Sequence, residues 1–420
     1  MKNFLYLLPF VIFFVLTSCG KDPGTKVTVK VEDVLGQQNL PLAVAYQIED
    51  GEWAWLQPDE NAGYSFYVPP GKERYGVAVR CGGFSSSITY VKRATIYQLA
   101  TSDTTEPVFI CPQDRKQYVY MNVTHDVSAI AGANGAAVYH RRSYSLLRGT
   151  SFTTNRPFFH TLQADVMFTA YSSSPANILA ARLVKGVDLE DGASLNFTLD
   201  NNDLVVSANV APFSLPAGWS GEYSVGIATK GELINWEALG RGNESGGSYS
   251  RIKGVDGNDY YLFSAWASRS ISSNRALSIR YARSLAASTA GDLEAHFPDP
   301  FPDTFAPGET GGRWAFGLDY PEETSGIYLT YSFNDTRAYV WASATWLQGK
   351  SSYSLPDISA ATGFATFDLP ATGRWGFCAL SGSAAFGELL ELSRLDNRPM
   401  PARMSTPVEI GYSCAYGASP

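Results

Sequence analysis

Histidine is the side chain that most often supplies acid–base chemistry or metal ligands near neutral pH, and this chain of 420 residues contains four. No two of them form a close ligand pair such as HxH or HExxH; they are His125, His140, His160 and His296. Serine offers no better candidate, because AGWSGE around Ser220 is one residue short of the GxSxG nucleophile elbow. We therefore predict no catalytic residue, no cofactor and no enzymatic activity.

Carboxylates gather in two short turns, DNND at 200–203 and VDGND at 255–259. Calcium takes six to eight oxygen ligands, and extracellular modules bind it through such turns. Neither stretch follows the spaced pattern of a known calcium loop, and Asn, Asp and Gly favour turns without any ion. We interpret both as ordinary turns and keep calcium as a weak alternative, with Asp200, Asp203, Asp256 and Asp259 as its ligands.

Tryptophans are the remaining side chains that could bind a ligand. Trp53 and Trp55 lie two residues apart in GEWAW, so on a strand both would face the same side of a sheet. If that side were exposed, the two rings would form a flat surface on which sugar rings stack, and Trp341 and Trp346 are similar candidates. Core packing is the favoured interpretation, because a buried Trp is common in β-sandwiches.

The elements that must position these residues are strands. In KVTVKVE, residues 26–32, valine alternates with polar residues at a period of two, and LNFTL and LSIRY repeat the alternation. GIYLTYSFNDTRAYVWASATW predicts two strands joined by a turn at Asn334 and Asp335. Tyr (24), Phe (23) and Gly (38) are plentiful, as expected of strands packed between tight turns. The sequence predicts an all-β protein of several tandem β-sandwich-like (Ig-like) domains.

The chain is long enough for several such domains. Two pairs of stretches are similar in sequence, which suggests internal repetition. Residues 55–81 resemble 346–378, and a stretch from Phe168 resembles one from Phe263. The predicted division is a signal peptide at 1–18, a tether at 19–26, and β-domains at 27–112, 113–205, 206–305 and 306–420. The third domain ends in a Pro-rich stretch from His296 that we predict to be a linker.

Four cysteines follow Cys19, and their even number suits disulfides formed in an oxidising compartment. They fall into two couples 30 and 36 residues apart, which favours Cys81–Cys111 and Cys378–Cys414 among the three possible pairings. Zinc is the rival interpretation, but no close CxxC spacing supports a structural zinc site.

The first residues indicate where the protein is targeted. Residues 4–16 are apolar apart from Pro9 and follow Lys2, and this run is too short to span a bilayer. It ends in Leu16-Thr17-Ser18-Cys19, which resembles the lipobox of bacterial lipoproteins: an aliphatic residue, two small ones and a cysteine. The resemblance implies cleavage before Cys19 and acylation of that cysteine, palmitate included, which anchors the protein in a membrane. An ordinary cleaved signal peptide is the alternative.

The residue after Cys19 indicates in which membrane the protein is located, and the net charge indicates which partners suit it. Gly20 stands where an aspartate would retain many lipoproteins in the inner membrane, so we expect the outer membrane or cell surface. The net charge of −8 does not suit nucleic acid as a partner. We predict a lipid-anchored envelope protein with a structural, adhesive or binding role toward glycans or envelope proteins. The alternative is a polysaccharide-acting hydrolase with two carboxylates about 5–10 Å apart.

Overall fold

The protein is described by a computed structural model that consists almost wholly of strands, as predicted. It describes residues 23–32, 38–82, 92–111, 118–140, 143–159, 163–175, 177–229, 232–253, 255, 257, 259–288, 290–320, 324–382, 386–387 and 409–418. Cys19 and Asp256 lie outside these residues, so the structure says nothing of the proposed lipid anchor. In the described part, no helix has the length and apolar character needed to cross a membrane.

The described residues of the first two predicted ranges form seven strands each. The strands of the first are β1 (Thr25–Glu32), β2 (Ala43–Ile48), β3 (Ala54–Trp55), β4 (Tyr64–Val68), β5 (Arg74–Cys81), β6 (Lys92–Ala100) and β7 (Val108–Ile110). The second contains β8 (Tyr118–Asp126), β9 (Gly135–His140), β10 (Ser143–Arg148), β11 (Ser151–Phe159), β12 (Gln163–Tyr171), β13 (Ile178–Asp188), β14 (Ser194–Thr198) and the 3-10 turn η1 (Asn201–Asp203).

The last two ranges supply the remaining elements. The third contains β15 (Val206–Val210), β16 (Ser220–Thr229), β17 (Glu232–Asn243), β18 (Gly247–Arg251), β19 (Asp259–Ser272) and β20 (Arg275–Ala286). The fourth contains β21 (Gly308–Thr310), β22 (Arg313–Gly317), β23 (Thr324–Phe333), β24 (Thr336–Ser343), the short helix α2 (Ala344–Leu347), β25 (Ser352–Ser354), β26 (Arg374–Gly382) and β27 (Glu409–Gly417). Asn334, with φ +50°, makes the predicted turn between β23 and β24.

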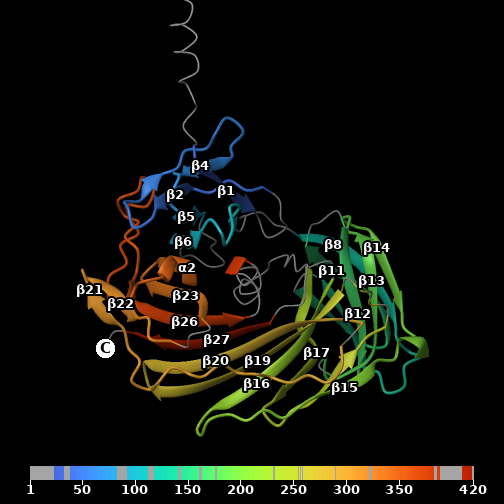
Figure 1. Cartoon of the computed structure of the whole chain (residues 1–420). Helices are drawn as coiled ribbons and strands as arrows, with labels where there is room; N and C mark the ends of the chain where they lie inside the picture. Colours follow the sequence, from blue (N-terminus) through green and yellow to red (C-terminus); the bar gives the residue numbers. More distant parts are fainter. Residues whose placement is uncertain are drawn as a thin grey trace, which may run out of the picture.

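One twelve-stranded sheet, here called the long sheet, runs through three of the four ranges. Its strand order is β17-β16-β19-β20-β27-β26-β23-β24-β6-β5-β2-β3. In Figure 1 it passes from the blue and cyan strands β2, β5 and β6, through the orange and red strands, to the yellow and green strands β20, β19 and β16. Three of the four predicted ranges are therefore joined edge to edge within one sheet.

Two seams hold the ranges together within the long sheet. At one, β24 pairs with β6 in parallel, from Thr336 opposite Lys92 to Ala342 opposite Gln98. At the other, β20 pairs with β27 in antiparallel fashion. Every other strand ladder of the described residues pairs strands from the same predicted range. Whether each range folds alone as a domain stays a prediction.

Smaller sheets cover the long sheet and create its cores. The β4-β1-β7 sheet packs over β2, β5 and β6, and it buries the alternating Val27, Val29 and Val31 predicted from KVTVKVE. The β21-β22-β25 sheet and α2 contribute to a second core on the opposite face. The β10-β9-β12-β13 sheet lies between β11-β8-β14 and the β16, β19 and β20 part of the long sheet, with an apolar cluster on each of its faces.

Both predicted disulfides are present. Cys81–Cys111 joins the end of β5 in the long sheet to the residue after β7, so it ties the two layers of a sandwich together. Cys378–Cys414 instead joins directly opposite residues on the neighbouring strands β26 and β27, with Cα atoms 4.0 Å apart. The two bonds therefore have different structural roles. The two similar stretches, 55–81 and 346–378, also begin on different elements, since Trp55 lies on β3 and Trp346 lies on α2.

The Pro-rich stretch from His296, predicted to be a linker, connects β20 to β21 and packs on the long sheet along the way. The rings of Phe301 and Phe305 contact each other and Phe377 of β26, with centroids 4.3 to 5.8 Å apart. Arg275 donates to the carbonyl oxygens of Asp303 and Phe305, which fixes the backbone of the stretch. Buried aromatic rings within the proline-rich sequence are the physical reason that it packs on the long sheet.

Candidate functional site

A cleft of about 740 Å³ lies where the Pro-rich stretch crosses one end of β20, β27, β26 and β23. Gly411 permits this crossing, since a Cβ atom there would meet Ser381 Oγ at 2.7 Å and Pro298 Cδ at 3.4 Å. Ser413, two residues along β27, accepts a hydrogen bond from the backbone N–H of Phe301 at 3.0 Å. The wall of the cleft is therefore set by contacts between the stretch and β27.

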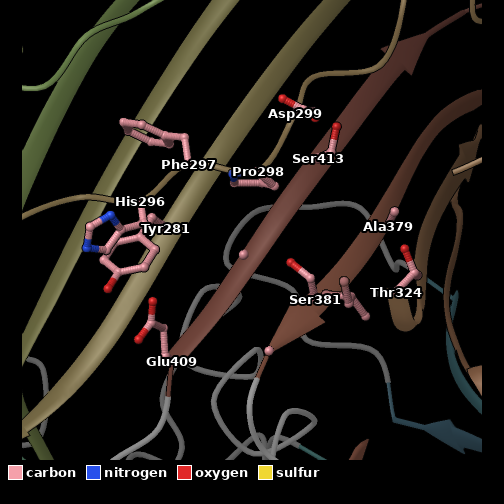
Figure 2. A pocket seen from close by; sticks show the side chains of 13 residues that line it. Tyr281, His296, Phe297, Pro298, Asp299, Thr324, Ala379, Ser381, Glu409 and Ser413 are labelled. Carbon is pink, nitrogen blue, oxygen red and sulfur yellow. The ribbon is translucent and has the colours of Figure 1, made fainter. Parts of the chain in front are cut away.

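Tyr281, His296 and Glu409 gather at one side of the cleft (Figure 2). The rings of Tyr281 and His296 meet edge to face, with centroids 5.6 Å apart and planes at 90°. Arg283 Nε lies 4.0 Å from Glu409 Oε2. An aromatic face, an imidazole and an ion pair thus converge from β20, β27 and the Pro-rich stretch.

The hydroxyl of Tyr281 is buried and, among the described residues, makes no hydrogen bond of good geometry. Burial raises the pKa of this hydroxyl far above its ordinary value, the Glu409 carboxylate raises it further, and the Arg283 guanidinium partly opposes both. The hydroxyl therefore stays protonated at physiological pH. It therefore does not act as a phenolate nucleophile.

The rest of the cleft is lined by short polar side chains. Asp299 and Ser413 lie together, and Thr324 and Ser381 lie on the far wall beside Ala379 (Figure 2). These groups present hydroxyl donors and acceptors and one further carboxylate. The arrangement suits recognition of a polar ligand that exposes its own hydroxyl groups.

Three of the four tryptophans proposed for ligand stacking are buried, which overturns that role for them. Trp53 is 6% exposed, Trp341 is 5% and Trp346 is 1%, whereas Trp55 is 45% exposed. Trp53 packs over Gly76, where an added Cβ would lie 2.8 Å from the indole ring, and so fills the core of the long sheet. Trp55 is exposed because β3 is the edge strand of the long sheet.

Trp346 helps to join the first and last ranges. The Arg74 guanidinium lies over its ring at 5.7 Å and donates to its carbonyl oxygen, and Lys350 Nζ lies 5.5 Å from the same ring. Glu49 holds Arg74 in place through an ion pair of 2.7 Å. Burial disfavours the charge on Glu49, but hydrogen bonds from Arg74 and from the amides of Glu73 and Arg74 outweigh it, so the pKa of Glu49 lies below its ordinary value.

The proposed calcium ligands that the structure describes are engaged by cations or by the backbone. Asp200 caps η1 by accepting from the amide of Asn202 at 2.7 Å. Both carboxylate oxygens of Asp203 accept from Arg182, at 2.8 and 2.5 Å, and Asp259 pairs with Lys185. Across the described part of the chain, no three His, Cys, Asp or Glu side chains gather as metal ligands.

The cleft residues were not predicted as a site from the sequence. Tyr281 was assigned to a strand through LSIRY, and His296 was placed in a linker. Glu409 lies 113 positions after His296, so no local pattern connects them. The one available signal was the cluster of prolines and phenylalanines after His296, which marks a stretch able to pack on a sheet.

Comparison with known proteins places the chain in no family. No family model and no curated protein matches it. The crystal structure of the pilus adhesin SpaC from Lactobacillus rhamnosus GG is similar over 76% of this chain and 42% of that chain, with 10% sequence identity and a TM-score of 0.15. The chain thus spans less than half the length of that adhesin. A TM-score this low does not indicate a shared fold.

Proposed function

We propose that this protein is a lipid-anchored protein of the cell envelope that binds a polar ligand, such as a glycan, in the cleft formed by β20, β27, β26 and the Pro-rich stretch. The observation that supports binding is the lining of the cleft, which combines aromatic rings with hydroxyl and carboxylate groups. The rings are those of His296 and Phe297, the hydroxyl groups belong to Thr324, Ser381 and Ser413, and the carboxylates to Asp299 and Glu409. Such sites combine stacking with a small number of oriented polar groups.

The same cleft favours binding over nucleophilic catalysis. Its tyrosine stays protonated, since burial and Glu409 raise its pKa. Asp299 shares the cleft with Glu409, however, and this pair of carboxylates is the feature on which a glycoside hydrolase alternative rests.

The anchor is proposed from the lipobox alone. Cleavage before Cys19 followed by acylation would fix the chain to a membrane through two or three acyl chains, and each buried methylene contributes about 0.8 kcal/mol. β1 begins at Thr25, so the proposed tether before the first strand is short. The outer membrane or cell surface is the location we propose.

Intact-protein mass on membrane fractions tests the anchor, with wild type compared to Cys19→Ser. We expect a chain that begins at Cys19 with added acyl mass, and a soluble, unmodified chain for the variant. Protease treatment of whole cells then separates an external position from a periplasmic one. An unmodified wild-type chain in the soluble fraction would refute the anchor.

Glycan-array binding of the soluble chain tests the cleft. Ser381→Ala removes a hydroxyl group from the wall of the cleft, and Glu409→Gln removes a charge at nearly constant volume. Glu222→Gln, on the exposed surface of β16, is the matched control. We expect both cleft variants to weaken binding and the control to retain it. Release of reducing sugar from a bound glycan, lost in Asp299→Asn and Glu409→Gln, would favour the hydrolase instead.

A further inference from the structure

A second groove, of about 630 Å³, lies at the opposite end of the strands that line the cleft. Its lining comes from β19, β20, β27, β26, β23 and β24, which are six consecutive strands of the long sheet. The groove therefore crosses the strands, and the side chains that face it are set by the register between neighbouring strands.

A row of arginines follows this register. Ser332 on β23 is opposite Arg374 on β26 and opposite Arg337 on β24, and Arg337 is opposite Arg93 on β6. Directly opposite residues point to the same face of a sheet. Because neighbouring strands lie about 4.8 Å apart, Arg374 and Arg337 are separated by roughly 10 Å, with the neutral Ser332 between them.

The next row, two residues further along the strands, is aromatic. Tyr416 on β27 is opposite Gly376, and Thr330 is opposite both Gly376 and Tyr339. A Cβ atom on Gly376 would lie 2.7 Å from the Tyr416 ring, so the glycine lets that ring lie against the sheet. Tyr416 is nevertheless 39% exposed. Three strands away from Tyr416, on β24, Tyr339 lies under the Arg93 guanidinium, 4.6 Å from its ring centroid.

Positive charge in this groove is available to a ligand. None of the described residues that line the groove is Asp or Glu, although the chain as a whole has a net charge of −8. Arg374 is exposed, and no described residue forms an ion pair with it or accepts its hydrogen bonds. The hydrogen bonds that Arg337 makes within the described part use only Nη1, which donates to the carbonyl oxygens of Asn334 and Thr336.

We propose that this groove binds an acidic polysaccharide, with Arg374 and Arg337 pairing with acid groups and Tyr416, on the neighbouring strand beyond Arg374, stacking on the next sugar of the chain. Arginine at a roughly 10 Å spacing, with a hydroxyl group in between, matches acid groups on alternate sugars. The phosphates of a single-stranded nucleic acid are more closely spaced than this pattern. The inference goes beyond the proposed function, because it names a ligand class for a second surface that shares no lining residue with the first cleft.

Affinity of the full chain in neutral detergent for four soluble polymers tests this proposal. Polygalacturonate carries carboxylates only, dextran sulfate carries sulfates only, dextran is neutral, and polyglutamate is a polyanion without sugar rings. We expect one or both acidic polysaccharides to bind, with an affinity that falls as salt rises. Which of them binds more tightly tells whether uronic acids or sulfated sugars are recognised.

Variants locate the binding. Arg374→Gln and Tyr416→Ala should each lower the affinity about tenfold, since a charge-assisted hydrogen bond or a stacking contact contributes roughly that much. Tyr416→Phe should keep most of the affinity because it keeps the ring. Arg241→Gln, which removes the same charge from β17 far along the long sheet, should leave the affinity unchanged. Unchanged circular dichroism and thermal midpoints exclude unfolding as the cause of a loss.

Three outcomes would overturn the groove proposal: dextran binding as tightly as the acidic polymers, polyglutamate or a single-stranded oligonucleotide binding as tightly as they do, or Arg374→Gln matching wild type. None of these outcomes bears on the proposed lipid anchor or on ligand binding in the first cleft. Acyl mass at Cys19 and the effect of Ser381→Ala on glycan-array binding are measured separately, so failure of the groove and failure of the proposed function are distinguishable.

Discussion

The ion pair between Lys185 and Asp259 joins two of the predicted ranges, and its loss should be costly. Lys185 lies on β13 and Asp259 begins β19, with Nζ 2.8 and 3.0 Å from the two carboxylate oxygens. The Asp259 side chain is 0% exposed and that of Lys185 is 23% exposed. Lys185→Met removes the cation and leaves a buried carboxylate without it.

The magnitude follows from burial and distance. At an effective dielectric constant of about 20, two unit charges 2.8 Å apart attract by about 6 kcal/mol before desolvation is considered. Removing one partner of a buried pair lowers the free energy of unfolding by about 3–5 kcal/mol, because the remaining charge stays desolvated. Lys30→Met provides the contrast, because the side chains of Lys30 and Glu106 in that ion pair are 44% and 57% exposed. Exposed pairs of this kind contribute about 0–1 kcal/mol to the free energy of unfolding.

Urea unfolding followed by tryptophan fluorescence measures both variants against the wild-type soluble chain. We expect Lys185→Met to shift the midpoint strongly, Lys185→Arg to shift it little, and Lys30→Met to stay near wild type. The double variant Lys185→Met/Asp259→Asn should be less destabilised than the sum of its single variants, because it removes the uncompensated charge. Equal shifts for Lys185→Met and Lys30→Met would refute the reasoning.

Three further predictions concern the fold. Trp53→Ala should lower the free energy of unfolding by about 3–5 kcal/mol because it empties a core site, whereas Trp55→Ala at the sheet edge should change it by less than about 1 kcal/mol; chemical denaturation compares them. Replacing Cys81 and Cys111 by serine should cost about 3–4 kcal/mol, since the bond closes a loop across 30 residues, and an unchanged midpoint under reducing conditions would contradict this. The pKa of Glu49 is lower in the folded state than its ordinary value of 4.5, so its ionised carboxylate stabilises the fold. This contribution to the free energy of unfolding is complete above pH 4.5 and is lost as the pH falls through the folded-state pKa. Glu49→Gln should therefore make the free energy of unfolding less dependent on pH in the acid range.

Several features were predictable from the sequence because they depend on neighbours in the chain. Alternation at a period of two identified the buried Val27, Val29 and Val31, since a pleated strand sends successive side chains to opposite faces. The turn at Asn334 followed from the tolerance of asparagine for positive φ. Cysteine number and spacing indicated Cys81–Cys111, because a local pairing closes a short loop.

Other features were decided only by the tertiary structure. The seam between β24 and β6 joins residues more than 200 positions apart, and nothing in either strand's pattern specifies its partner. That seam and its neighbours determine that Trp341 is buried while Trp55 lies at an edge, although both are tryptophans in alternating stretches. Arg374, Arg337 and Tyr416 share a groove for the same reason. Alternation determines the face on which a side chain lies, but only strand order and register determine which side chains meet there.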